Sequence, residues 1–120
     1  MKFLYYIFIT IIIAVAGILF WQKGLNKQAS LAQSGSEHIV ELSNDGYSPK
    51  DLTIQRGDTV KFTTTRDAHF WPASNLHSSH RIYPDFDPQE PIATGKSWSF
   101  RFDQVGNWRY HDHISPYFTG

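Results

Sequence analysis

Residues 97–113 read SWSFRFDQVGNWRYHDH. Every second residue from Trp98 to Phe102 is aromatic, and the same alternation resumes at Trp108 and Tyr110 after a glycine-containing turn. Strict alternation of apolar and polar residues is typical of a β-strand that buries one face. This region therefore predicts two strands joined by a turn.

The same period of two continues upstream. It is found over residues 38–42, 52–54 and 60–64, with turn residues between the runs. No segment after residue 22 has helical periodicity longer than a turn. Residues 37–120 are therefore predicted to form an all-β domain, a sandwich or barrel. The segment between Thr65 and Thr94 contains four prolines and no sustained periodicity, and loops of that length are usually functional.

An uncharged run precedes this domain. Residues 3–21 read FLYYIFITIIIAVAGILFW, close to the ~20 residues that a helix needs to cross a bilayer. We expect residues 1–22 to be a single membrane anchor and the polar residues 23–36 to be a linker. A cleaved signal peptide is the alternative, since Ala14-Val15-Ala16 resembles a cleavage site and Ser30-Leu31-Ala32 is a second candidate. Lysines on both sides of the run leave the orientation open.

Composition excludes several classes of function. The chain has 11 basic and 11 acidic residues and no cysteine. Balanced charge gives no electrostatic footprint for nucleic acid. The absence of cysteine excludes disulfide scaffolds, thiol catalysis, iron–sulfur clusters and thiolate-ligated copper or zinc.

Histidines form two tight pairs, His77-x-x-His80 and His111-x-His113. Both members of an H-x-H pair lie on one face of a strand, about 6–7 Å apart, so both can approach one metal. Imidazole suits copper, zinc, nickel and iron, and copper(II) binds most tightly among the divalent ions. We therefore predict a metal site at His77, His80, His111 and His113. Copper(II) is the expected ion, with another divalent metal as the alternative.

The position of this site depends on the last strand. If Tyr110 faces the core, Asp112 does so too, and His111 and His113 lie on the outer face under the His77/His80 loop. Alternatively, a strand end near His111 breaks the alternation. His38 is expected on a strand surface without a role. The acidic residues Asp85, Asp87 and Glu90 are expected in a solvated loop.

The sequence from residue 37 to 120 resembles the cupredoxin family, the Greek-key β-sandwich of plastocyanin-like copper proteins. Strand motifs carry part of the resemblance: Tyr47-Ser48-Pro49, Leu52-Thr53-Ile54, Gly57-Asp58-Thr59-Val60 and Gly106-Asn107-Trp108-Arg109-Tyr110. Loop motifs are similar to one bacterial, membrane-anchored or secreted branch: FWPASN at 70–75, LHSSH at 76–80, IYP at 82–84, FDP at 86–88 and YHDH at 110–113.

The chain departs from the type 1 copper pattern of that family. The positions of its cysteine, histidine and methionine ligands correspond to Asp112, Ser115 and Phe118. Its upstream histidine corresponds roughly to His69. A type 1 site is therefore excluded, and a nitrogen-ligated site of type 2 character is expected if copper binds.

The resemblance also implies a location and a further strand. Such domains lie outside the cytoplasm, so we expect a single-pass protein of the cell membrane with its domain on the periplasmic or extracellular side. In cupredoxins a final strand follows the glycine that corresponds to Gly120. The domain at 37–120 is therefore expected to lack its last strand and to leave the loop at 114–118 loosely held.

Three functions follow from these observations. The first is a membrane-anchored copper- or metal-binding protein that is not an enzyme and acts in copper handling or slow electron transfer. The second is a degenerate multicopper-oxidase-like domain active only as an oligomer, because the motif at 110–113 resembles the H-x-H strand of those enzymes. The third is an interaction module with structural histidines. The sequence identifies no protein partner.

Overall fold

The computed structural model describes residues 14–25 and 35–120. The chain divides into two units, Met1–Ser34 and Gly35–Gly120. In the first unit, residues 14–25 form a helix. Within the described residues no helix has both the length and the apolar character needed to span a bilayer. Most of the predicted span at 3–21 and most of the predicted linker at 23–36 lie outside the described residues.

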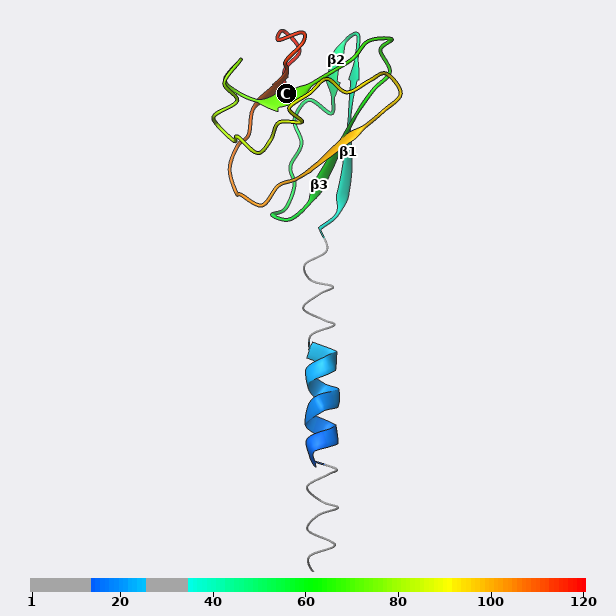
Figure 1. The fold of residues 1–120 in the computed structure, drawn as a ribbon, viewed down its shortest axis with the longest axis vertical. Helices are drawn as coiled ribbons and strands as arrows, with labels where there is room; N and C mark the ends of the chain where they lie inside the picture. Colours follow the sequence, from blue (N-terminus) through cyan, green and yellow to red (C-terminus); the bar gives the residue numbers. More distant parts are fainter. Residues whose placement is uncertain (1–13, 26–34) are drawn as a thin grey trace, which may run out of the picture. The chain divides into compact units, whose positions relative to one another are not determined.

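The second unit contains a four-stranded sheet in the order β2-β1-β3-β5 (Figure 1). Its strands are β1 (Glu37–Ser43), β2 (Gly46–Ser48), β3 (Thr59–Thr64) and β5 (Trp98–Arg101). Strands β1 and β3 are parallel, with Val40 opposite Phe62, whereas β2 and β5 pair antiparallel to their neighbours. Glycine at position 46 has φ of 119°, a conformation that allows the tight turn between β1 and β2.

A second sheet pairs β4 (Pro72–Ser74) with β6 (Tyr110–Asp112) in antiparallel register. The end of the chain folds back along the other edge of β6, where Tyr110 and Gly120 exchange two backbone hydrogen bonds of 3.1 and 3.0 Å. The backbone N–H of Asp112 donates to the carbonyl of Phe118 at 2.9 Å. The expectation of a loosely held loop at 114–118 is therefore wrong, because its far end is paired to β6.

The core lies between these two sheets. It contains the apolar side chains that alternate along the strands, joined by aromatic residues from the long loop: Val40, Leu42, Tyr47, Val60, Phe62, Phe70, Tyr83, Phe86, Ile92, Phe102 and Tyr110. Phe86 is fully buried, and its ring stacks on Phe100 with centroids 5.2 Å apart. The resulting β-sandwich confirms the all-β prediction, although residues 52–54, predicted to be a strand, are irregular.

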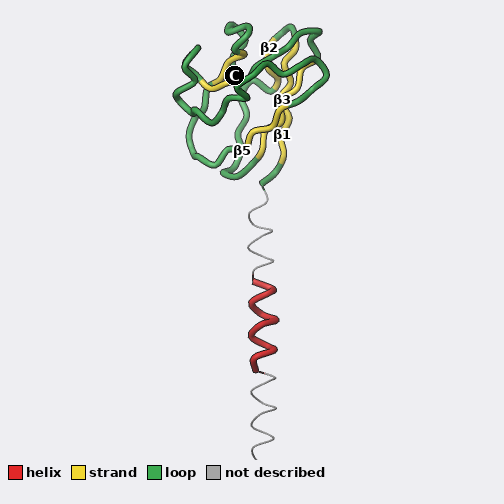
Figure 2. Tube along the Cα trace, in the orientation of Figure 1, coloured by secondary structure: helices red, strands yellow, loops and turns green. Residues whose placement is uncertain are grey.

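The long segment from Thr65 to Thr94 contains one short strand, β4, and otherwise consists of loops and turns (Figure 2). Phe70 and Ile92 exchange backbone hydrogen bonds of 3.1 and 2.8 Å, and the N–H of Ser74 donates to the carbonyl of Phe86 at 2.9 Å. Burial of Phe70, Tyr83 and Phe86 removes large apolar surfaces from water. The loop is therefore a fixed support for the side chains that it carries.

Candidate metal centre

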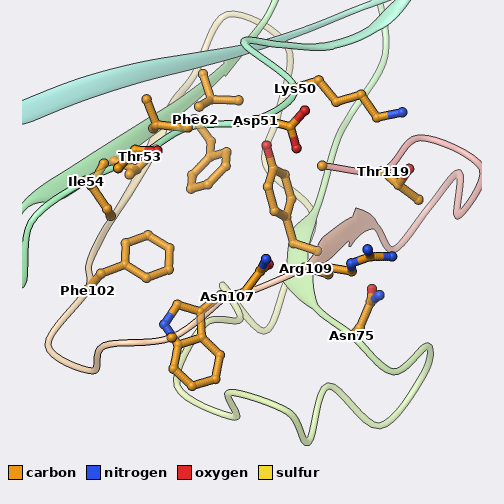
Figure 3. A pocket seen from close by; sticks show the side chains of 17 residues that line it. Lys50, Asp51, Thr53, Ile54, Phe62, Asn75, Phe102, Asn107, Arg109 and Thr119 are labelled. Carbon is orange, nitrogen blue, oxygen red and sulfur yellow. The ribbon is translucent and has the colours of Figure 1, made fainter.

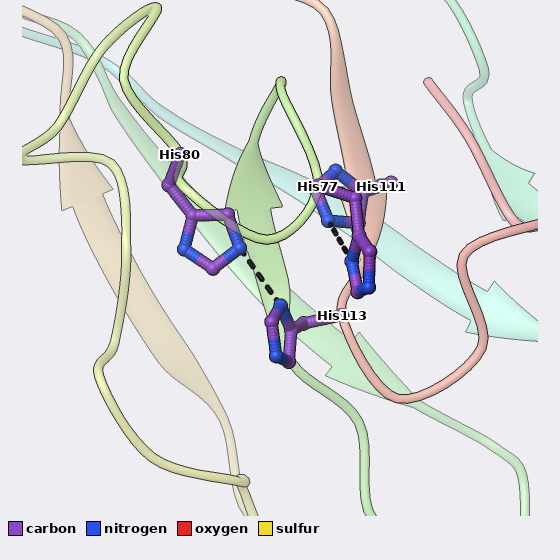
Figure 4. Close-up of side chains that lie close together, drawn as sticks. All are labelled: His77, His80, His111 and His113. Carbon is purple, nitrogen blue, oxygen red and sulfur yellow. Dashed lines mark hydrogen bonds between the residues drawn. The ribbon is translucent and has the colours of Figure 1, made fainter.

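Four histidines converge on one point (Figure 4). His77 and His80 come from the loop after β4, His111 lies in β6, and His113 directly follows it. One nitrogen from each ring lies within 4.8 Å of the other three. The structure thus brings together all four histidines for which the sequence predicts a metal site.

Strand alternation explains this convergence. Tyr110 joins the hydrophobic core and Asp112 is completely buried, so the side chains of His111 and His113 project from the other face of β6. The loop that carries His77 and His80 covers that face. Of the two arrangements that the sequence allows, the structure has the one with unbroken alternation.

The nitrogen atoms that face one another form two close pairs. Nδ1 of His77 lies 3.2 Å from Nε2 of His111, and Nε2 of His80 lies 2.8 Å from Nδ1 of His113. Nitrogens bound to one ion at about 2.0–2.1 Å are about 2.9 Å apart at right angles and about 3.4 Å apart in a tetrahedron. The two close pairs therefore match neighbouring ligands of one copper or zinc ion, and the four nitrogens, which lie within 4.8 Å of one another, would have to draw slightly closer to bind it together.

His80 is oriented by a carboxylate that the sequence analysis treated as part of a solvated loop. Its Nδ1 donates to Oδ2 of Asp87 at 2.6 Å, and Oδ1 of Asp87 accepts a 2.8 Å hydrogen bond from the indole of Trp71. Burial opposes ionisation of Asp87, but the hydrogen bonds from His80, Gln89 and Trp71 lower its pKa overall. The assignment of Asp87 to a solvated loop is therefore wrong, because it fixes His80 with Nε2 free to bind a metal.

His111 and His113 are held by other contacts. Nδ1 of His111 donates to Oδ1 of Asn75 at 2.9 Å, which leaves Nε2 as the free nitrogen. The ring of His113 packs on that of Trp71 with centroids 4.6 Å apart, and its backbone N–H donates to the Trp71 carbonyl at 2.7 Å. The sequence pattern does not reveal these supports: Asn75 and Trp71 lie far along the chain from the histidines that they contact, and Asp87 stands in a stretch whose composition suggests a solvated loop.

The surroundings favour neutral imidazoles, the form that binds metals. Desolvation and the neighbouring histidines lower the pKa of His111 to about 4. Desolvation and the charges of His80 and His77 also lower the pKa of His113. Both rings are therefore ready to bind a cation near pH 7 without first losing a proton to solvent.

The remaining histidines lie apart from this group. His38 bonds through Nε2 to Oδ2 of Asp58 at 2.8 Å. The expectation that His38 has no role is therefore incomplete, since this contact ties β1 to the turn before β3. His69 is exposed and does not belong to the four-histidine group.

Asp112, at the position that corresponds to the type 1 cysteine, forms an ion pair on the inner face of β6. Nη1 of Arg66 lies 3.7 Å from Oδ2 of Asp112, and the guanidinium lies 4.8 Å from the ring centre of Phe118. Neither the carboxylate of Asp112 nor the aromatic ring of Phe118 is a soft ligand of the kind that a type 1 copper site requires.

A separate cleft of about 630 Å³ opens between the irregular segment at 50–54 and the segment at 106–110 (Figure 3). Core side chains such as Phe62 and Phe102 form part of its lining, and Lys50, Asp51 and Arg109 supply charge. None of the four clustered histidines lines it. Asn75 contributes to its wall as well as to the support of His111.

Comparisons with known proteins agree with this architecture. No protein-family model and no curated protein matches the sequence. Among solved structures, the chain is similar to one titled "Novel Purple Cupredoxin from Nitrosopumilus maritimus", with a TM-score of 0.55 and 21% identity over 68% of this chain and 93% of that one. At this identity the likeness concerns the fold. The domain at residues 35–120 therefore has a cupredoxin-like fold, with no cysteine or type 1 ligand set.

Proposed function

We propose that this protein binds one copper(II) ion through His77, His80, His111 and His113. The observation that carries the proposal is the convergence of four ring nitrogens within 4.8 Å of one another. The hydrogen bonds to Asp87 and Asn75 strengthen it, because each directs the free nitrogen of a buried imidazole toward the common point.

The donor set favours copper(II) over softer ions. Imidazole nitrogens suit copper, zinc, nickel and iron, and copper(II) is the strongest binder of the divalent series. With no cysteine in the chain, a copper–thiolate bond cannot form. The bound ion should therefore give type 2 spectra and no intense blue band.

We further propose a role in copper handling or slow electron transfer rather than catalysis. Four protein ligands close the coordination sphere of a four-coordinate ion, whereas catalytic metal sites keep a position open for substrate. The ion supplies the redox or cargo chemistry when bound. The four histidines would hold the ion, and the hydrogen bonds to Asp87 and Asn75 keep two of the imidazole rings in place.

We also propose that the uncharged run at 3–21 anchors the protein as a single-pass component of the cell membrane, with the domain on the periplasmic or extracellular side. Its length and lack of charge support an anchor. Full-length protein should then fractionate with membranes and retain its N-terminus. A soluble mature form that begins at Gly17 or Gln33 would contradict this.

Metal titration of the full-length chain tests the central proposal. Wild-type protein without an affinity tag should bind one copper(II) with nitrogen hyperfine structure in its electron paramagnetic resonance (EPR) spectrum. The double variant His111→Ala/His113→Ala should bind none, whereas His38→Ala should bind like wild type. Equal uptake by wild type and the double variant would place the site elsewhere or exclude it.

A further inference from the structure

The four histidines differ in how firmly the protein holds them. His80 and His111 are 5% and 2% exposed, and each donates a ring hydrogen bond to a fixed partner, Asp87 or Asn75. His113 is half-buried against Trp71. His77 is exposed. Within residues 35–120, the ring of His77 makes its one hydrogen bond to His111, itself a member of the group.

The backbone around His77 is equally open. Leu76, Ser78 and Ser79 are exposed. The loop is tied at its ends, where the N–H of Asn75 donates to Arg109 at 3.0 Å and that of His80 donates to Leu76 at 2.7 Å. Within the described domain, residues 77–79 form no backbone hydrogen bond with another segment. His77 can therefore move outward without the loss of a core contact.

We infer that His77 is the exchange ligand of this site, through which copper(II) passes to an acceptor that presents an imidazole. This inference rests on the proposed copper site. In the exchange step the bond between copper and Nδ1 of His77 breaks, and a bond to the acceptor's imidazole nitrogen forms. Copper keeps its oxidation state, and both imidazoles remain neutral. Meanwhile His80, His111 and His113 hold the ion.

The difference between the exposed His77 and the three supported histidines favours copper delivery over electron transfer, the two roles proposed above. An electron-transfer site benefits from ligands that stay fixed when the charge of the ion changes, because each rearrangement adds to the barrier. Three supported ligands and one unsupported, solvent-facing ligand instead provide firm retention with one accessible position. The acceptor should approach from the side of His77, the most exposed of the four ligands, since His80 and His111 are buried.

Comparison of His77→Ala with His113→Ala in the full-length protein tests this inference. Both variants remove one ligand whose side chain is not fully buried, so the fold should survive in each, as melting of the metal-free proteins will verify. His77→Ala should keep one copper(II) with a lower affinity than wild type, and should release it to EDTA faster than wild type. His113→Ala should lose far more affinity.

Free imidazole provides a second readout. In His77→Ala it should occupy the vacated, solvent-facing position and restore the four-nitrogen EPR spectrum. Equal affinity losses in the two variants, or no rescue of His77→Ala, would overturn the inference and leave the copper site standing. No copper binding by wild type would overturn both.

Discussion

Oδ2 of Asp87 lies 2.6 Å from Nδ1 of His80. The two residues lie seven positions apart in a loop that also carries the fully buried Phe86, so the core fixes the carboxylate and the carboxylate fixes the ligand. Carboxylate partners of this kind set the tautomer of a metal-binding histidine and raise its basicity. The fold thereby connects the packing of one aromatic ring to the geometry of the proposed site.

Substitution Asp87→Asn should lower the affinity for copper(II) by roughly 10- to 100-fold. The amide removes the charge that favours a proton on Nδ1 of His80, while its oxygen still accepts the hydrogen bond from Trp71. Competition titration measures the change. The exposed neighbour Asp85 offers a matched control, since Asp85→Asn should bind like wild type. Equal affinities for the two variants would remove Asp87 from the site.

The stability of metal-free protein should decrease as pH falls from about 6.5 to about 4. Desolvation and neighbouring histidines lower the pKa of His111 to about 4 in the native state, whereas an unfolded histidine titrates near ~6.5. Between these values the unfolded state binds a proton that the native state does not, so acid favours unfolding. At about 1.4 kcal/mol per unit, the loss is on the order of 3 kcal/mol.

Urea unfolding at several pH values, with wild type compared with His111→Gln, measures this effect. Burial raises the pKa of Asp112, which adds a pH dependence of opposite sign that both proteins share. The difference between the two curves therefore isolates His111. Parallel curves from pH 7 to pH 4 would show that His111 titrates normally in the folded protein.

Much of this fold is readable from the sequence because alternation reports directly which strand face is buried. The runs at 38–42, 60–64 and 97–102 correspond to β1, β3 and β5. The run at 52–54 does not form a strand, because a short apolar alternation needs a paired neighbour to become one. Period two also places His111 and His113 on one side of β6, although it does not determine which partner faces them.

The supports of the site follow from tertiary packing and not from local pattern. Asn75 lies 36 positions from His111, and Trp71 lies 16 positions from Asp87. The long loop brings these residues together in space, and its buried aromatic residues hold it in that conformation. An acidic residue in a proline-rich loop is usually solvated, so composition alone favours the wrong environment for Asp87.

Substitution His38→Ala should reduce stability without an effect on copper. The hydrogen bond between Nε2 of His38 and Asp58 is 2.8 Å long, and its loss should cost about 0.5–1.5 kcal/mol. Asp58 keeps its hydrogen bonds from the backbone of Ser36 and Gln55, so the turn should persist. Urea denaturation gives the stability change, and copper titration of the same sample should give the wild-type affinity.

The buried pair of Arg66 and Asp112 should be strongly coupled. Asp112 is fully buried, and its Oδ2 lies 3.7 Å from Nη1 of Arg66 without a hydrogen-bond partner within the described residues. Arg66→Met leaves an uncompensated buried carboxylate, so it should cost about 3–5 kcal/mol. Addition of Asp112→Asn removes that charge and should recover part of the loss.

A double-mutant cycle in urea measures this coupling, which should reach about 1–3 kcal/mol for residues in direct contact. The Oδ1 atom of Asp112 also accepts a 2.6 Å hydrogen bond from the backbone of Trp71, the residue that packs on His113. Asparagine can preserve that bond, so the double variant should still bind copper. Additive effects of the two substitutions would mean that Asp112 carries no charge at pH 7, and that its contact with Trp71, and not the ion pair, holds β6 in place.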